Sequence, residues 1–105
     1  MNIIWSDLAV GAFWAIRDSI FSKFGIEKEN EFVEATDVAI KQVVKFPKSG
    51  IEELELAADG SVRSILVRKL SKIIYYIDGD TLHVADVWDI RQDPDALNTR
   101  VAAIL

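Results

Sequence analysis

The stretch KIIYYIDGDTLHVADVW, residues 72–88, decides the fold of this chain. Its two halves are rich in β-branched and aromatic residues, which favour strands. Asp78-Gly79 lies between the halves and is a strong signal for a tight hairpin turn. The stretch therefore predicts two antiparallel strands. VRSILVRK at residues 62–69 is expected to form a third strand, and IEELELA at residues 51–57 is a weaker candidate for an irregular edge strand.

Two amphipathic helices are expected before these strands. Apolar residues recur every three or four positions from Leu8 to Phe24 and again from Phe32 to Phe46. Gly25 separates the two patterns, and Pro47 ends the second because a proline disfavours helical geometry in the residue before it. So short a link predicts an antiparallel helical hairpin.

Both ends of the chain carry further signals. MNIIW at residues 1–5 is a short apolar run that suits a strand, and Ser6 after it is a common helix cap. Asp93-Pro94 predicts a short C-terminal helix, with the aspartate as cap and the proline at the first helical position. The order β-α-α-β-β-β predicts one α+β domain over residues 1–105, with the helical hairpin packed on a sheet of roughly three to four antiparallel strands.

Composition excludes several classes of function. The chain has 105 residues, no cysteine and one histidine, so we expect neither a thiolate metal site nor a disulfide, and we expect no metal or cofactor. No apolar run approaches the roughly 18 residues that a membrane span needs, and the N-terminus lacks the basic region of a signal peptide. We therefore expect a cytoplasmic protein.

The charge distribution is uneven along the chain. The formal net charge is −5, and residues 1–60 hold eleven acidic against six basic residues. Residues 61–77 instead hold four cations and no acid: Arg63, Arg68, Lys69 and Lys72. Cations concentrated on adjacent strands of an acidic body predict a face that meets an anionic or polar partner.

The strings IIWSDLA, FPKSG, VRSILV and KIIYYIDGDTLHVADVWDIRQDP, in this order, resemble the RelE/ParE superfamily of bacterial toxins of type II toxin–antitoxin pairs. The resemblance covers nearly the whole chain and implies a cognate antitoxin as partner. RelE-like members cut messenger RNA within the ribosome, using basic side chains on the sheet and often a tyrosine near the C-terminus. ParE-like members are associated with blocking DNA gyrase through protein contact, without hydrolysis.

The residues favour the ParE-like branch. A ribonuclease would use Arg63 and Lys72 to stabilise the phosphate and His83 as acid or base, although a partly buried structural histidine is the more common case. No tyrosine follows Tyr76, and a pI near 4.7 is unsuited to binding RNA. We therefore interpret the chain as a gyrase-directed toxin without enzymatic activity, with a RelE-type endoribonuclease or an inactive relic that still binds antitoxin as the alternatives.

The interpretation assigns residues to two contact surfaces. Trp14, which cannot share the centre of the apolar helix stripe with Phe13, and Tyr75 are predicted to contact a protein partner. The predicted target-binding residues are the five cations of the later strands and the tail: Arg63, Arg68, Lys69, Lys72 and Arg91.

Overall fold

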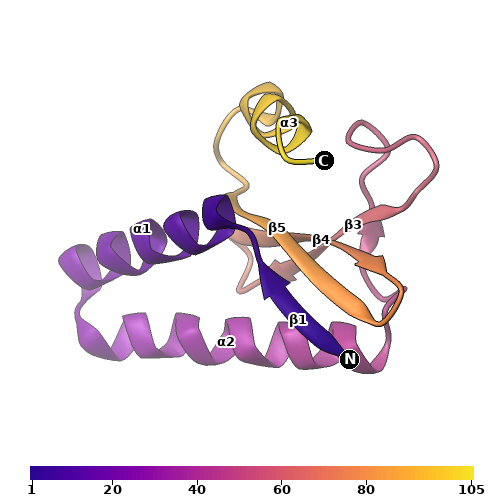
Figure 1. The fold of residues 1–105 in the computed structure, drawn as a ribbon. Helices are drawn as coiled ribbons and strands as arrows, with labels where there is room; N and C mark the ends of the chain where they lie inside the picture. The colour runs from indigo at the N-terminus through magenta and orange to yellow at the C-terminus, as the bar shows by residue number, and fades with distance from the viewer.

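The computed structural model describes residues 1–105 and contains three helices and a five-stranded sheet (Figure 1). The elements are β1 (Asn2–Trp5), α1 (Asp7–Phe24), α2 (Ile26–Lys45), β2 (Ile51–Glu52), β3 (Val62–Val67), β4 (Ser71–Asp78), β5 (Thr81–Asp89) and α3 (Pro94–Ala102). The predicted α+β class, helical hairpin and C-terminal helix are confirmed. No helix has both the length and the apolar character needed to span a membrane.

The sheet has the strand order β1-β5-β4-β3-β2. β3, β4 and β5 pair antiparallel as expected, but the sheet has more strands than predicted and is mixed, because β1 pairs parallel with β5. Parallel neighbours need a long crossover connection, which the helical hairpin and the intervening strands supply here. β2 is only two residues long, since the chain turns away after Glu53, whose carbonyl accepts the Leu56 N–H.

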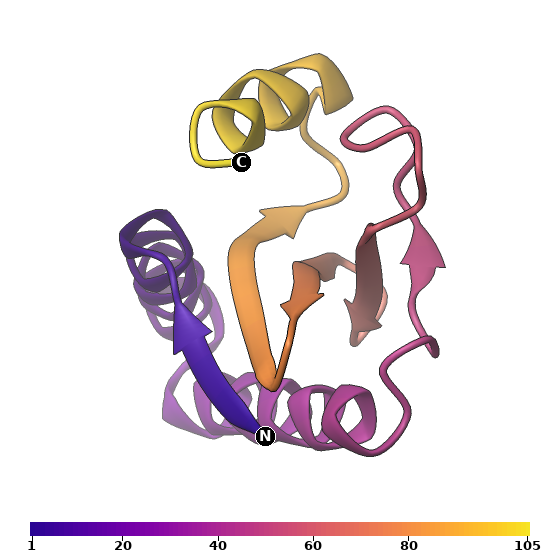
Figure 2. The ribbon, with the colours of Figure 1, turned by 45° about the vertical axis from the view of Figure 1, so that its right-hand side comes forward.

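Helices cover both faces of the sheet (Figure 2). α1 and α2 pack on one face, which we call the hairpin face, and α3 packs on the other, the α3 face. The core on the hairpin face is built from eleven buried residues: Ala9, Phe32, Ala39, Ile40, Val43, Val67, Ile73, Tyr75, Leu82, Val84 and Val87. A smaller core lies under α3: Val62, Ile74, Ala85, Trp88, Leu97 and Val101.

The predicted turn and cap residues take the expected roles. The Ser6 hydroxyl accepts the Ala9 N–H at the start of α1, and the Asp93 carboxylate accepts the Asp95 N–H at the start of α3. Gly25 joins α1 to α2 with a φ of 91°, in the region that favours glycine. Gly79 has a φ of 59° in the two-residue turn between β4 and β5, as a tight hairpin requires.

A β-bulge in β5 changes which residues share a face. Strict alternation would place Val87 on the face of His83 and Ala85. In the structure Ile74 pairs with Asp86 and Tyr75 with Val84, so Ala85 is an extra residue. Val87 therefore faces the helical hairpin, whereas Ala85 and Asp86 both face α3. Val87 therefore does not share a face with His83, although strict alternation from the sequence predicts that it does.

Candidate functional site

The segment that follows α2, residues 45–50, is the best-defined candidate site, and we call it the 45–50 loop. Pro47 stops α2, and the last helical bond runs from the Phe46 N–H to the Gln42 carbonyl. The Ser49 N–H then donates to the Phe46 carbonyl over 2.9 Å and closes a tight turn. The loop thus has a defined backbone of its own.

Two side chains of the sheet clamp this backbone. The Tyr75 hydroxyl donates to the Pro47 carbonyl over 2.8 Å and accepts the Gly50 N–H over 3.0 Å. The Arg63 guanidinium donates to the Gly50 carbonyl over 2.8 Å and to the Lys48 carbonyl over 3.3 Å. Because β3 and β4 are each paired with a strand on either side, these bonds fix the loop to the interior of the sheet.

Gly50 and Tyr75 fit each other closely. A Cβ at position 50 would lie 2.5 Å from the Tyr75 hydroxyl oxygen and 2.7 Å from the Ser64 carbonyl oxygen, so a larger residue does not fit. Burial raises the pKa of the Tyr75 hydroxyl, although the Gly50 N–H and the Arg63 charge oppose this rise. The hydroxyl therefore keeps its proton and remains a donor to Pro47.

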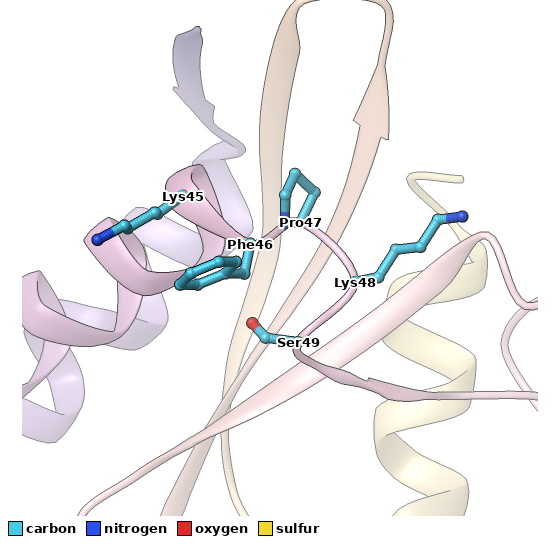
Figure 3. A pocket seen from close by; sticks show the side chains of 5 residues that line it. All are labelled: Lys45, Phe46, Pro47, Lys48 and Ser49. Atoms are coloured by element: carbon cyan, nitrogen blue, oxygen red, sulfur yellow. The ribbon is translucent and has the colours of Figure 1, made fainter.

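The 45–50 loop presents a cationic and aromatic surface to solvent (Figure 3). Lys45, Phe46, Pro47, Lys48 and Ser49 line an open hollow, and the two lysine side chains extend to either side of Phe46 and Pro47. Phe46 is exposed, and the Lys45 ammonium lies 5.5 Å from the centre of its ring. Exposed aromatic side chains beside cations are typical of surfaces that bind another molecule.

The lysines of this loop differ from most cations of the chain because they have no acidic partner. Eight of the twelve Lys and Arg residues form an ion pair with a carboxylate. Lys45 and Lys48 form none, and they are only three positions apart, whereas the other unpaired lysines, Lys23 and Lys69, stand alone. The 45–50 loop therefore concentrates positive charge that the chain itself does not neutralise.

The single basic face predicted from residues 61–77 does not form. Arg63 pairs in register with Tyr75 on the hairpin face, whereas Lys72 pairs with Trp88 on the α3 face. The two cations point to opposite sides of the sheet because side chains alternate along a strand. Arg68 and Lys69 lie in the turn between β3 and β4, where both have positive φ.

Acidic side chains from neighbouring elements neutralise most of the predicted cations. Arg63 lies 3.4 Å from Glu52, and Lys72 lies 3.0 Å from Glu53, which also accepts the Ser64 hydroxyl.

Two further cations are paired near the ends of strands. Arg68 lies 3.3 Å from Glu31 of α2, and Arg91 lies 2.7 Å from Asp89. The hydrogen bond from Arg91 holds the pKa of Asp89 below its usual range. Lys69 alone among the five predicted target-binding cations is unpaired.

The residues proposed for a ribonuclease do not converge on one point. Arg63 lies on the hairpin face, while Lys72 and His83 lie on the α3 face. Lys72 is four residues from Tyr76, the partner of His83, which places the two side chains roughly 13 Å apart along the strands. The His83 ring stacks on Tyr76 with centroids 4.6 Å apart. Nor is any group of three or more acidic or histidine side chains placed to hold a metal ion.

The two predicted partner-binding aromatics have different surroundings. Tyr75 is 1% exposed and forms the clamp, so the prediction that it contacts a partner is wrong; the half-buried tyrosine is Tyr76. Trp14 is 51% exposed, with the Arg17 guanidinium 4.1 Å from its ring centre. Trp14 is thus free to contact a partner, and that role stays a prediction.

The sequence predicts Pro47 as the end of a helix and assigns no functional role to residues 45–50. The signal was present as two lysines around Phe-Pro with no acid among residues 45–50. A second missed signal was the acidic run IEELE at residues 51–55, which supplies carboxylates to the basic strands.

The architecture defines a class: a two-helix hairpin on one face of a sheet whose first strand lies parallel at the edge. No family model and no curated protein sequence matches the chain. A solved structure described as "Chromosomal ParDE TA system from P. aeruginosa" is similar to it, with a TM-score of 0.68 and 17% identity over 85% of this chain and 95% of that chain. This similarity shows a shared fold and confirms the fold that the RelE/ParE resemblance implied.

Proposed function

We propose that this chain is the toxin of a type II toxin–antitoxin pair, which binds and inhibits a target protein and is neutralised by a cognate antitoxin. The observation that carries the proposal is the fold shared with a chain of a ParDE system over 95% of that chain. DNA gyrase is the proposed target, as the ParE-like resemblance implies. This target places the site of action in the cytoplasm.

The geometry supports binding rather than turnover. Arg63, Lys72 and His83 lie on different faces or far apart, and Tyr75 is buried and protonated. General acid–base cleavage of RNA needs such groups within hydrogen-bond reach of one phosphate. The 45–50 loop instead offers a rigid, exposed surface, and rigidity reduces the entropy that binding costs.

The target contact is proposed to centre on Lys45, Phe46 and Lys48. Arg63 contributes by holding the loop backbone. Lys72 holds Glu53 beside β3. Arg68, Lys69 and Arg91 stay proposed as target contacts, but in a second area away from the 45–50 loop. Arg68 and Arg91 line hollows beside Phe24, near the α1–α2 connection.

The antitoxin is proposed to cover the outer surface of the helical hairpin. α1 buries only Ala9 completely, and it leaves several large apolar side chains exposed, including Trp14, Phe21 and Phe24. An exposed apolar surface of this kind marks a protein interaction site. It is separate from the 45–50 loop, which lies at the far end of α2 from the α1–α2 connection (Figure 1).

Supercoiling of relaxed plasmid by purified gyrase tests the proposal. We expect the purified chain to inhibit supercoiling at stoichiometric amounts. Unchanged supercoiling at stoichiometric excess would contradict a gyrase target.

Two observations in cells separate the alternatives. Codon-phased transcript ends after brief induction would instead support a ribosome-dependent ribonuclease. Unaffected growth on induction in the native host, without the antitoxin, would support an inactive relic.

A further inference from the structure

The two edges of the sheet are protected to different degrees. β2 is two residues long, contains Glu52 and is followed by Glu53. Short strands and charged side chains are the usual protection of a sheet edge against pairing with another chain. β1 is twice as long, and residues 1–6 contain no charged side chain and no proline. The β1 edge therefore lacks the protection that the β2 edge has.

The register of β1 shows which of its backbone groups are unused. The Asn2 N–H donates to the Asp80 carbonyl over 2.9 Å, and the Ser6 N–H donates to the Val84 carbonyl over 3.0 Å. Even-numbered residues therefore direct their N–H and C=O groups toward β5. Ile3 and Trp5 direct theirs toward the open edge, because these groups alternate along a strand.

Apolar side chains flank this edge on both faces. Ile3 pairs in register with Leu82 and is 43% exposed on the hairpin face, while Ile4 pairs with His83 and is 53% exposed on the α3 face. Ile4 also lines a small hollow together with Ile104, which is itself exposed. The edge combines unpaired backbone groups with exposed apolar side chains.

We propose that this edge pairs with the same edge of a second copy of the chain, antiparallel and about a two-fold axis at Ile4. In that register Ile3 of each copy lies opposite Trp5 of the other, and the outward groups of both residues form about four hydrogen bonds. Ile4 meets Ile4 of the second copy directly. Each unused group of one edge thus finds its complement in the other, as a symmetric dimer interface requires.

The lack of charged side chains in residues 1–6 favours a second copy of the chain over a charged peptide as the partner of the β1 edge. The side chains of residues 1–6 offer no ion partner to an acidic or basic segment, and the N-terminal ammonium of Met1 lies 4.0 Å from Asp80 of its own chain. A second copy brings an equally apolar strand. Each copy carries a net charge of −5, so the two bodies repel each other outside the edge. The dimer is therefore stabilised by added salt, which screens that repulsion.

Sedimentation velocity of the purified chain tests the dimer. We expect a species of twice the 11.8 kDa chain mass, with a population that increases with salt. Ile4→Lys places two ammonium groups opposite each other and should weaken the dimer by about a hundredfold. Ile51→Lys, at the 69% exposed residue of the β2 edge, is the matched control and should leave the dimer intact.

A cross-link provides a second, independent readout. The chain has no cysteine, so a single introduced cysteine can only form a disulfide between copies. In the proposed dimer, position 4 of one copy faces position 4 of the other as a non-hydrogen-bonded pair. The Cα atoms of such a pair are about 4.5 Å apart, within the range that a disulfide spans. Ile4→Cys should therefore oxidise rapidly to a covalent dimer, and Ile51→Cys should not.

Two outcomes would overturn the proposal. One is a wild-type chain that sediments as a monomer at millimolar concentration. The other is an Ile4→Cys variant that cross-links no faster than Ile51→Cys.

Discussion

Removing the Tyr75 hydroxyl tests whether the sheet holds the 45–50 loop in place. In the folded chain this hydroxyl donates to the Pro47 carbonyl over 2.8 Å and accepts the N–H of buried Gly50 over 3.0 Å. Tyr75→Phe leaves the Gly50 N–H without an acceptor. A buried polar group without a partner costs about 1–3 kcal/mol, and the lost bond to Pro47 adds about 1 kcal/mol. We therefore expect the free energy of unfolding to fall by about 2–4 kcal/mol.

Urea unfolding measures this change, with Tyr76→Phe as the matched control. Tyr76 is half-buried and stacks on His83, and its hydroxyl takes no part in holding the loop. The control should change stability by no more than about 0.5 kcal/mol. A similar loss of stability in the two variants would show that the clamp contributes nothing of its own.

Two further substitutions test the packing and the electrostatics on either face of the sheet. Gly50→Ala should destabilise the fold by about 2–3 kcal/mol because the added Cβ meets Tyr75 and Ser64. The control Gly11→Ala, which has open space around it in α1, should stabilise the fold by up to about 1 kcal/mol. Equal effects of the two variants in thermal unfolding would contradict the close fit at Gly50. Arg100→Met removes the guanidinium nitrogen 2.9 Å from the fully buried Asp86 and should cost about 3 kcal/mol or more at about pH 7. Burial raises the pKa of the Asp86 carboxyl above its ordinary value of 3.8. The folded chain therefore binds a proton at Asp86 more tightly than the unfolded chain does. The free energy of unfolding accordingly falls as the pH rises from the pKa of the unfolded chain to the higher pKa of the folded chain. The cost of Arg100→Met should accordingly shrink toward about pH 4, and a cost independent of pH in urea titrations would show that Asp86 is not the charge involved.

Local signals made the elements predictable from the sequence. Asp93-Pro94, Asp78-Gly79 and Gly25 each impose a backbone conformation within a few residues, so they mark helix starts and turns without knowledge of the fold. The parallel position of β1 could not be predicted in this way, because it depends on contacts between residues about eighty positions apart. The bulge at Ala85 is likewise visible only in the register between β4 and β5.

The functional surface was harder to predict than the fold. Arg63 and Lys72 belong to adjacent strands, and only the register decides whether two such residues share a face. That register pairs Lys72 with Leu66, three positions from Arg63, so the two cations point apart. Their neutralisation by Glu52 and Glu53 depends on the β2–β3 register, which pairs Glu52 with Arg63, and on where β2 ends. The weak alternation of residues 51–57 predicts neither.

The central claim is that the chain inhibits a protein target through the 45–50 loop. Inhibition of gyrase supercoiling should be compared for the wild-type chain, for Lys45→Glu with Lys48→Glu, and for Lys23→Glu with Lys28→Glu. Both double variants add the same negative charge at exposed lysines, but the second pair lies at the α1–α2 connection.

We expect the wild-type chain and the Lys23/Lys28 variant to inhibit equally, and the Lys45/Lys48 variant to lose inhibition while remaining folded. Equal inhibition by all three proteins, or none by the wild-type chain, would contradict the central claim.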